Sequence, residues 1–270
     1  MKSILLVLSV LALAACNSQK LSTDVADGSN TNSITHGSPV KAGEDVTKWT
    51  VALGPKGDAY CTGVIIDKHH IVSAAHCTEA MTDSQVTFSL NAFDNKAESR
   101  KIKNLIRHEA YCEKEECMGG DTMGLNNDIL LIEFEGDLPA GFEPAPIADD
   151  SDLKSGDLVL MVGFGLDHNG DFDGIMKETK APVVEISASE FLTDEKKSGT
   201  CNGDSGGPIF IEKDGKLKLM GLTSRGDGPC RHHGIYTKVP FYFGWILNNI
   251  VGTVAETPVV EVVPAVVVTP

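Results

Sequence analysis

Short apolar runs separated by turn-forming residues make up most of the hydrophobic pattern of this chain, and helical periodicity is rare. The pattern predicts strands at residues 61–66, 71–74, 128–134, 157–163, 182–186, 208–211, 217–223 and 235–239. Repeated short strands of this kind are typical of barrels and sandwiches, and the pattern alone does not distinguish the two. We therefore expect an all-β fold.

Two further segments complete the predicted elements. Residues 212–216, with the sequence EKDGK, lie between two predicted strands and indicate a hairpin loop. Residues 241–251, which follow Pro240, are the one segment that resembles a helix of any length. The 270 residues are enough for one large or two small hydrophobic cores.

Residues 1–16 have the features of a targeting segment. A positively charged start precedes an apolar stretch at residues 4–14 that is too short to span a membrane. The sequence LAAC that ends at Cys16 is similar to the site that bacterial lipoprotein signal peptidase cuts before the cysteine is lipidated. We predict an exported protein held at the bacterial cell envelope by a lipid on Cys16, at the outer membrane if the host is Gram-negative. An ordinary secretory signal, with Ala12 and Ala14 as the cleavage pair, is the alternative.

The segments on either side of the predicted strands differ from them in composition. Residues 17–33 are rich in Ser, Thr, Asn, Asp and Gly and predict a flexible linker or propeptide. Residues 252–270 are rich in Val, Pro and Glu, and their prolines oppose a helix, so we expect an extended tail. The folded domain is then expected over residues 34–251.

The charge balance limits the partners of the chain. The formal net charge is −15, from 38 acidic and 23 basic residues, and no basic run is present. This argues against a nucleic acid or an anionic lipid surface as a partner. We expect contact with a membrane only through the lipid anchor.

The cysteines favour disulfides over metal binding. Setting Cys16 aside for the lipid leaves six of the seven cysteines, an even number in an exported chain. Six cysteines allow fifteen pairings. Cys112 and Cys117 are spaced in a way that also permits a metal site, but no nearby His or third Cys completes one.

Three short motifs carry candidate chemistry. Residues 201–208 read CNGDSGGP, residues 74–77 read AAHC, and residues 127–132 read NDILLI. A serine hydroxyl is a poor nucleophile at neutral pH, and it needs a base, a group that orients the base, and donors for the oxyanion that forms. Glycines beside a serine allow backbone N–H groups to approach a reacting carbonyl closely.

In their chain order, His76, Asp128 and Ser205, these motifs resemble the trypsin/chymotrypsin family of serine endopeptidases. The resemblance covers about residues 34–251. It implies two six-stranded antiparallel β-barrels with a C-terminal helix, and an active site in the cleft between the barrels. The alternatives are a catalytically inactive, protease-like binding module and a surface adhesin built on the same fold.

The resemblance implies a role for each catalytic residue. His76 is the general base toward Ser205 and then the general acid toward the leaving amine. Asp128 holds the other imidazole nitrogen, and the N–H groups of Gly203 and Ser205 form the oxyanion hole. Substrates are then proteins or peptides, with no cofactor. The family pattern also pairs Cys61 with Cys77 and Cys201 with Cys230, which leaves Cys112 and Cys117 as the third pair.

Specificity is expected to depend on a pocket beside Ser205. The implied substrate-binding residues are Gly199, Thr200, Ser224, Arg225, Gly226 and Gly234. With Gly199 at its base and glycines at its walls, the pocket is predicted to be uncharged and unobstructed, which favours cleavage after large apolar residues. Arg225 departs from the family, which usually has Trp there, and it is expected either to cover the pocket or to attract an acidic substrate residue.

The start of the folded domain resembles the family's mature N-terminus. We expect a zymogen that is activated by a cut between Ser33 and Ile34, after which the new amino group of Ile34 pairs with Asp204. Ser33 does not suit trypsin, so the activating protease is expected to accept small residues. The alternative is that the chain is active without processing.

One acidic loop has the spacing of a calcium site. Asp167, Asn169, Asp171, Asp173 and Glu178 occupy positions 1, 3, 5, 7 and 12 of a calcium-loop pattern. Phe172 stands where such loops have Gly, so an ordinary acidic surface loop is the favoured interpretation.

Overall fold

The computed structural model describes residues 34–112, 123–124, 126–167 and 169–254. The predicted targeting segment and linker lie outside these residues. The predicted tail does too, except for residues 252–254, which form the end of the C-terminal helix. The elements are, in chain order, β1 (Ser38–Pro39), α1 (Val46–Trp49), β2 (Thr50–Gly54), β3 (Cys61–Ile65), β4 (His70–Ser73), η1 (Ala75–Met81), β5 (Gln85–Phe88), β6 (Glu98–Arg107), β7 (Leu130–Phe134), η2 (Asp150–Asp152), β8 (Leu158–Gly163), β9 (Lys177–Ile186), β10 (Glu190–Asp194), β11 (Pro208–Lys213), β12 (Lys216–Gly226), β13 (His233–Lys238), η3 (Val239–Tyr242) and α3 (Phe243–Val254).

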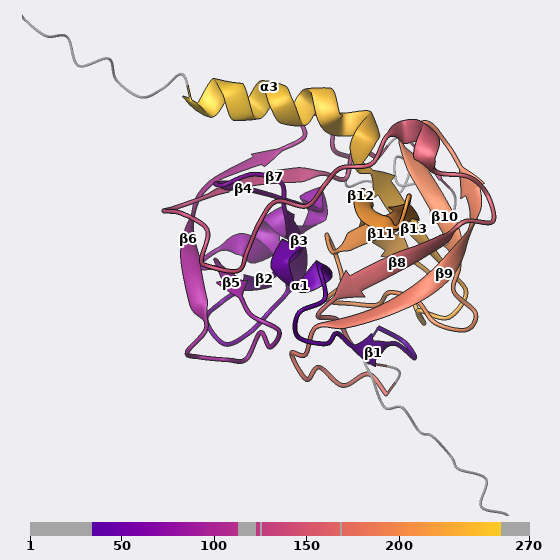
Figure 1. Cartoon of the computed structure of the whole chain (residues 1–270), viewed down its shortest axis with the longest axis horizontal. Coiled ribbons are helices and arrows are strands. Elements are labelled where there is room, and N and C mark those ends of the chain that lie inside the picture. The colour runs from indigo at the N-terminus through magenta and orange to yellow at the C-terminus, as the bar shows by residue number, and fades with distance from the viewer. Residues whose placement is uncertain (1–33, 113–122, 125, 168, 255–270) are drawn as a thin grey trace, which may run out of the picture.

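The strands form two antiparallel barrels that lie side by side (Figure 1). The first barrel closes in the order β2-β3-β4-β7-β6-β5. The second sheet has the order β1-β9-β10-β13-β12-β11-β8, and an additional pairing of β8 with β9 closes its six longer strands. The predicted pair of six-stranded barrels is confirmed, and so is the C-terminal helix α3.

Three groups of buried apolar side chains account for the long apolar runs in the sequence. One group fills the first barrel, a second fills the other, and a third lies between them. In β8, Met161 points into the second barrel while the neighbouring Leu160 and Val162 face the other barrel. Because both faces of such strands are buried, they are apolar at successive positions rather than at alternate ones.

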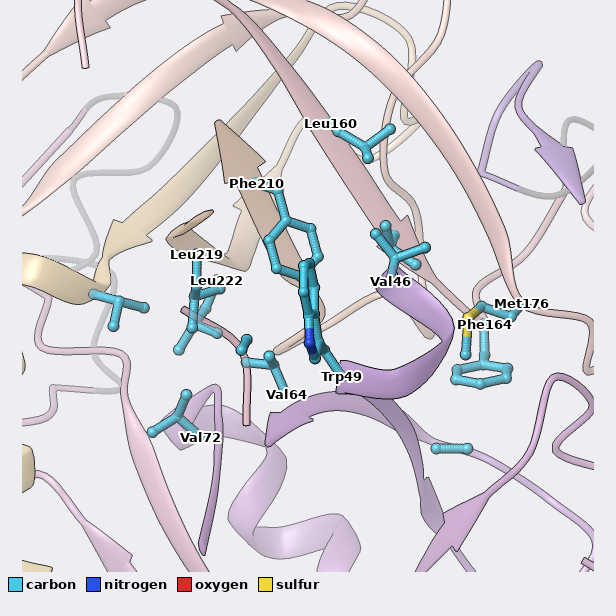
Figure 2. Packing of buried hydrophobic residues seen from close by; sticks show 14 of the residues in the cluster. Val46, Trp49, Val64, Val72, Leu160, Phe164, Met176, Phe210, Leu219 and Leu222 are labelled. Atoms are coloured by element: carbon cyan, nitrogen blue, oxygen red, sulfur yellow. The ribbon is translucent and has the colours of Figure 1, made fainter. Parts of the chain in front are cut away.

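The contact between the barrels is dominated by large side chains (Figure 2). The Trp49 ring packs on the Phe210 ring with centroids 5.3 Å apart. Leu219 and Leu222 belong to the same cluster, as does Ile246 of α3. Burial of apolar area on this scale stabilises the relative position of the two barrels, at about 25 cal/mol per Å².

Strand register brings residues from distant parts of the sequence to one end of the first barrel. Strands β4 and β7 are antiparallel, and Ser73 at the end of β4 pairs with Leu130 at the start of β7. The residues just after β4 and just before β7 therefore lie together. Among the described residues, no helix is both long and apolar enough to cross a membrane.

Candidate active site

The register of β4 and β7 places His76 beside Asp128. The His76 ring Nδ1 lies 2.9 Å from Oδ2 of Asp128, and the His76 backbone N–H donates to Oδ1 at 3.0 Å. Two contacts from one carboxylate fix both the position and the orientation of the imidazole. The Asp128 side chain is buried, whereas that of His76 is 32% exposed and can meet a substrate.

This pairing changes the pKa of both groups. Burial by itself lowers the pKa of His76, but the charge of Asp128 and its hydrogen bond outweigh burial, so the pKa of His76 lies above its ordinary value. Burial by itself raises the pKa of Asp128, but the His76 charge and the hydrogen bonds from His76 and Ser224 hold that pKa below its ordinary value. Asp128 is thus ionised and supports a proton on His76.

The hydroxyl of Ser224 also belongs to this network. Ser224 Oγ donates to Oδ2 of Asp128 at 2.6 Å, and Thr237 Oγ1 donates to the Asp128 carbonyl oxygen at 3.0 Å. From the sequence, Ser224 was expected only to bind substrate, and Thr237 was not singled out. Both lie on strands of the second barrel, so these bonds tie Asp128 of the first barrel to its neighbour.

The loop that carries Ser205 is shaped by glycines. Gly203 has φ = 95°, and a Cβ there would lie 2.8 Å from the Cα of Gly165, so no larger residue fits. The carbonyl oxygens of this loop point at the first barrel: Thr62 Oγ1 donates to the Gly203 carbonyl at 3.1 Å and the Thr62 N–H to the Ser205 carbonyl at 2.8 Å. In the described part of the chain, the N–H groups of Gly203 and Ser205 have no acceptor, which leaves two donors for an oxyanion.

Ser205 and His76 both lie close to Cys77. The Cys77 sulfur lies within 4.8 Å of a His76 ring nitrogen and 3.8 Å from the Ser205 carbonyl oxygen. No hydrogen bond joins the Ser205 hydroxyl to His76 among the described residues. Catalytic hydrogen bonds often form or tighten only when substrate is bound.

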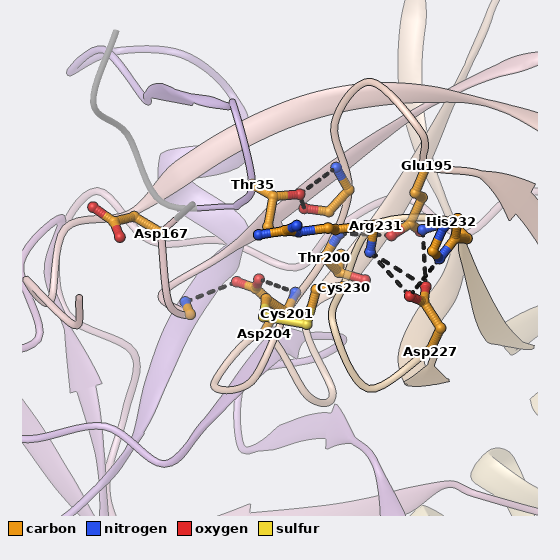
Figure 3. The surroundings of a disulfide bond; sticks show 12 residues. Thr35, Asp167, Glu195, Thr200, Cys201, Asp204, Asp227, Cys230, Arg231 and His232 are labelled. Carbon is orange, nitrogen blue, oxygen red and sulfur yellow. Dashed lines mark hydrogen bonds and ion pairs between the residues drawn. A yellow bond between two sulfur atoms is a disulfide. The ribbon is translucent and has the colours of Figure 1, made fainter. Parts of the chain in front are cut away.

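Two of the three expected disulfides are confirmed. Cys61 bonds to Cys77 with a Cα–Cα distance of 6.4 Å, and Cys201 bonds to Cys230 with a Cα–Cα distance of 5.3 Å. Cys112 is disulfide-bonded as well, but Cys117 lies outside the described residues. The first disulfide braces the turn that carries His76, and the second braces the loop before Ser205 (Figure 3).

A cavity of about 120 Å³ lies next to Ser205. It is lined by five of the predicted catalytic and substrate-binding residues, Thr200, Ser205, Ser224, Arg225 and Gly226, and by the disulfide of Cys201 and Cys230. The structure corrects the expectation of an uncharged, unobstructed pocket. The carboxylate of Glu195 fills the space beside Gly199 and Gly234, so that a side chain at either glycine would collide with it.

Arg225 neither covers the cavity as a free side chain nor offers its charge to a substrate. Its guanidinium donates to both oxygens of Glu190, at 2.7 and 3.0 Å. Both side chains are largely buried, with 12% of Arg225 and 2% of Glu190 exposed. The charge of Arg225 is therefore neutralised within the protein.

The predicted activation residues are both buried. Asp204 is fully enclosed, and its carboxylate accepts hydrogen bonds from Gly165 N–H at 2.8 Å and Cys201 N–H at 2.9 Å. Burial raises the pKa of Asp204 to about 7. Ile34 is fully buried too, and the next residue, Thr35, exchanges hydrogen bonds with Gly199 (Figure 3).

The structure disperses the acidic residues of the calcium pattern. Asp167 accepts the backbone N–H groups of Asn169 and Asp171, and Asp173 forms an ion pair with Lys177. Glu178 borders a different cavity, next to Glu44. Calcium binding stays a prediction. The one cluster of metal-ligand type within the described ranges is Cys61, His76 and Cys77, whose sulfurs are tied in a disulfide.

A family model for trypsin matches residues 34–246, a range that contains His76, Asp128 and Ser205. The chain therefore belongs to the trypsin family of serine proteases. It is 26% identical over 270 residues to transmembrane protease serine 11B of Homo sapiens, covering 90% of this chain and 63% of that protein. It is 26% identical over 223 residues to serine protease filzig of Drosophila melanogaster, covering 71% of this chain and 12% of that protein.

The chain thus spans less than two thirds of the length of these curated relatives. Among solved structures, it is similar to neuropsin, described as a serine protease expressed in the limbic system of mouse brain. The TM-score is 0.67 at 22% identity, covering 80% of this chain and 100% of that structure. This likeness concerns the fold.

Proposed function

We propose that this protein is a serine endopeptidase in which His76, Asp128 and Ser205 act as a catalytic triad. The observation that carries the proposal is the two-point contact between Asp128 and His76, close to a serine whose N–H, like that of Gly203, has no acceptor among the described residues. Protein or peptide chains are the proposed substrates. An inactive binding module would have no need for this arrangement.

The proposed reaction assigns one step to each of these groups. Ser205 Oγ attacks the carbonyl carbon of the scissile bond while Nε2 of His76 takes the hydroxyl proton. The carbonyl oxygen becomes an oxyanion that accepts hydrogen bonds from the N–H groups of Gly203 and Ser205. When the C–N bond breaks, His76 gives its proton to the leaving amine and an acyl-enzyme remains. Water, deprotonated by His76, then releases the acid and restores the Ser205 hydroxyl.

The same proposal includes activation by a cut between Ser33 and Ile34. Asp204 is a buried carboxylate with no ion pair among the described residues, and an α-amino group would supply its missing charge partner. Ile34 has φ = 47°, a conformation that β-branched residues rarely adopt, and a cut before this residue removes that constraint. Thr35 links the same segment to Gly199 of the specificity pocket.

Export and anchoring through a lipid on Cys16 are part of the proposal and depend on the sequence alone. The relatives named above come from human and fruit fly, so they lend no support to a bacterial anchor. One of them is named as a transmembrane protease. A cut before Ile34 would release the folded domain from Cys16, so activation and release would coincide.

The direct test of the proposal is peptide hydrolysis by the cut chain and by its Ser205→Ala variant. Turnover is expected to fall on the order of 10⁴- to 10⁶-fold, while the circular dichroism spectrum stays unchanged. Ser155→Ala, at an exposed serine that does not line the cavity beside Ser205, is the matched control and is expected to keep full activity. Equal turnover by the parent and Ser205→Ala would overturn the proposal. Tight binding of peptides without any turnover by the cut parent would favour the binding module instead.

A further inference from the structure

The C-terminal helix α3 carries a stripe of exposed apolar side chains. Phe243, Leu247 and Val251 are 41%, 44% and 67% exposed. Residues four apart lie one above the other on the same face of a helix, so these three side chains form a continuous row, which we call the α3 stripe. Single exposed apolar residues are ordinary on a protein surface, but a continuous row of them marks a surface that another group contacts.

A different face of α3 packs against the barrels. Ile246 is buried in the cluster between the barrels, and Trp245 and Ile250 pack against that cluster. Figure 1 shows α3 at the edge of the molecule, with one side turned away from both barrels. The α3 stripe therefore plays no part in holding the helix on the fold.

The helix also lacks the charged side chains that normally face water. Residues 239–255 contain no charged residue, although 23% of the whole chain is charged. Asn248 is the one polar side chain among the exposed positions of residues 243–251. A helix that is apolar on both faces is expected to be covered on both. The residues that the structure describes cover one of them.

The segment that follows α3 directly has a matching pattern. Residues 255–270, which lie outside the described residues, contain seven valines, and their charged residues are Glu256 and Glu261. In an extended chain successive side chains point to opposite faces. One face of residues 260–268 is then entirely apolar and consists of Val260, Val262, Pro264, Val266 and Val268. Glu261 belongs to the other face.

The length of this segment suits the length of the helix. The 12 residues of α3 extend over about 18 Å. An extended chain advances about 3.3 Å per residue, so about six residues are enough to run back along the helix. Residues 255–259 remain for the reversal of direction, and the apolar face of residues 260–268 is long enough to reach from Val251 to Phe243.

From this match we infer that residues 260–268 fold back along α3 and dock their apolar face on the α3 stripe. The β-branched valines and Pro264 have few conformations to lose, so ordering this segment costs little entropy. The docked segment removes Phe243, Leu247 and Val251 from water. The inference is independent of the proposed catalysis, because none of these residues lines the cavity beside Ser205.

A second copy of the chain fits the α3 stripe less well than the chain's own tail. A face about 18 Å long and about 10 Å wide is much smaller than the about 800 Å² that each partner buries in a stable complex. Residues 260–268 are tethered within a few residues of Val251, which gives them an effective concentration in the millimolar range. A small contact is therefore sufficient for the tail and insufficient for a separate molecule.

A lipid surface is also a poorer occupant. Helices that lie in a membrane interface carry Lys and Arg on their polar face, and α3 has neither. The formal net charge of −15 opposes approach to anionic lipids. Residues 255–270 bring two carboxylates and no cation to the same end of the molecule, which adds to this repulsion.

The test is an NMR measurement on the full chain carrying Ser205→Ala, which prevents self-cleavage. Nuclear Overhauser effects are expected between the methyl groups of Leu247 and those of the even-numbered valines, and backbone order parameters of residues 260–268 should exceed about 0.6. Leu247→Asp places a charge in the α3 stripe and should lower these order parameters below about 0.6. Leu158→Asp, at an exposed leucine of β8, is the matched control and should leave them unchanged.

A second pair of variants tests which face of the segment docks. Val262→Asp and Val263→Asp make the same change at neighbouring positions on opposite faces. Val262→Asp should release the segment, and Val263→Asp should not. The inference is overturned if residues 260–268 have order parameters below about 0.6 in the parent, or if the two variants act alike. It is also overturned if the order appears only as protein concentration is raised, which indicates a second copy, or only when phosphatidylcholine vesicles are added, which indicates a lipid surface.

Discussion

The buried carboxylate of Asp128 accepts three hydrogen bonds, from the His76 ring, the His76 backbone and the Ser224 hydroxyl. Each of them stabilises the ionised form, which offsets the cost of burying the charge. The result is an imidazole in one orientation, with the far ring nitrogen directed away from Asp128. These contacts shift the pKa values of His76 and Asp128, so the activity that depends on them should vary with pH.

The pH profile of kcat/KM should show the raised pKa of His76. Only the neutral imidazole can take the Ser205 proton, so activity is lost as pH falls through that pKa, and the acid limb should lie above ~6.5. Ser224→Ala removes a donor from Asp128, which strengthens its attraction for the imidazolium and should move the limb higher. Ser155→Ala should leave the limb in place. A limb at or below ~6.5 in the parent would contradict this account.

The candidate catalytic residues could be identified from the sequence because each lies in a short motif that is recognisable without knowledge of the fold. Glu195 was missed for the opposite reason. The residues around Glu195 form no recognisable motif. Its carboxylate comes to lie against Gly199 and Gly234 only in the folded chain. The hydrogen bond from Ser224 to Asp128 was likewise invisible, since it joins residues of two different barrels.

At the scale of elements, the ion pair between Arg225 and Glu190 joins β12 to β10. It is bidentate and largely buried, and Glu190 also accepts the N–H of Gly124 at 2.7 Å. Strands β10 and β12 do not pair directly, because β13 lies between them. The pair therefore ties the sheet together across an intervening strand.

Removal of one partner should destabilise the protein strongly. Glu190→Ala removes the buried carboxylate that two guanidinium nitrogens of Arg225 contact, and we expect a loss of about 3–5 kcal/mol in the free energy of unfolding, measured in urea. Replacing both residues, as Glu190→Ala with Arg225→Leu, should restore part of it. Glu98→Ala, at an exposed glutamate that pairs with Arg100, is the control and should cost less than about 1 kcal/mol. A similar small loss for Glu190→Ala would show that the pair contributes little.

The predicted ranges located eight of the strands but left out the two-residue β1 and the longer strands β2, β5, β6 and β10, and of these four longer strands only β6 is largely polar and exposed. Strand β6, with the sequence ESRKIKNLIR, is partly or fully exposed along its length and carries no clear alternation. It forms because both its neighbours, β5 and β7, offer hydrogen-bonding edges. The hairpin between β11 and β12 was predicted from the segment EKDGK between two apolar runs, and in the structure Asp214 and Gly215 both adopt positive φ, as a two-residue turn requires.

At the scale of the whole molecule, the N-terminal segment meets the loop before Ser205 at Gly199, where Thr35 forms hydrogen bonds with it. Burial raises the pKa of Asp204 despite the opposing charge of Lys177, so the folded, uncut chain binds the Asp204 proton more tightly than the unfolded chain does. An acid whose pKa is raised by folding makes the folded state less stable as pH rises, here between about 4 and 7. Cutting the chain before Ile34 should supply the amine that reverses this effect.

The free energy of unfolding of the uncut chain should therefore depend on pH through Asp204. Relative to Asp204→Asn, the parent should lose up to about 4 kcal/mol in the free energy of unfolding between pH 4 and pH 7.5, because each pKa unit corresponds to about 1.4 kcal/mol. Both proteins carry Ser205→Ala to prevent self-cleavage and are unfolded in urea. In the chain cut before Ile34 the difference should shrink. An equal difference in cut and uncut chains would contradict the proposed pairing of Ile34 with Asp204.

The choice between barrel and sandwich could not be made from strand patterns. That choice depends on which strand edges meet, and here the closing pairs β2–β5 and β8–β9 join strands far apart in the sequence or separated by a long loop. The resemblance carried by the motifs around His76 and Ser205 supplied what the pattern lacked. The placement of Glu195 and the pairing of Arg225 required the folded structure.

The most direct test of the central claim is labelling of the chain, cut before Ile34, with a fluorophosphonate, followed by mass spectrometry of its peptides. The reagent forms a bond between phosphorus and an activated serine oxygen and releases fluoride, while the base takes the hydroxyl proton. The account predicts one adduct, on Ser205, that is absent in Ser205→Ala and forms at least about 10³-fold more slowly in His76→Ala. An unlabelled Ser205 in the cut chain, or equal labelling of Ser205→Ala, would contradict it.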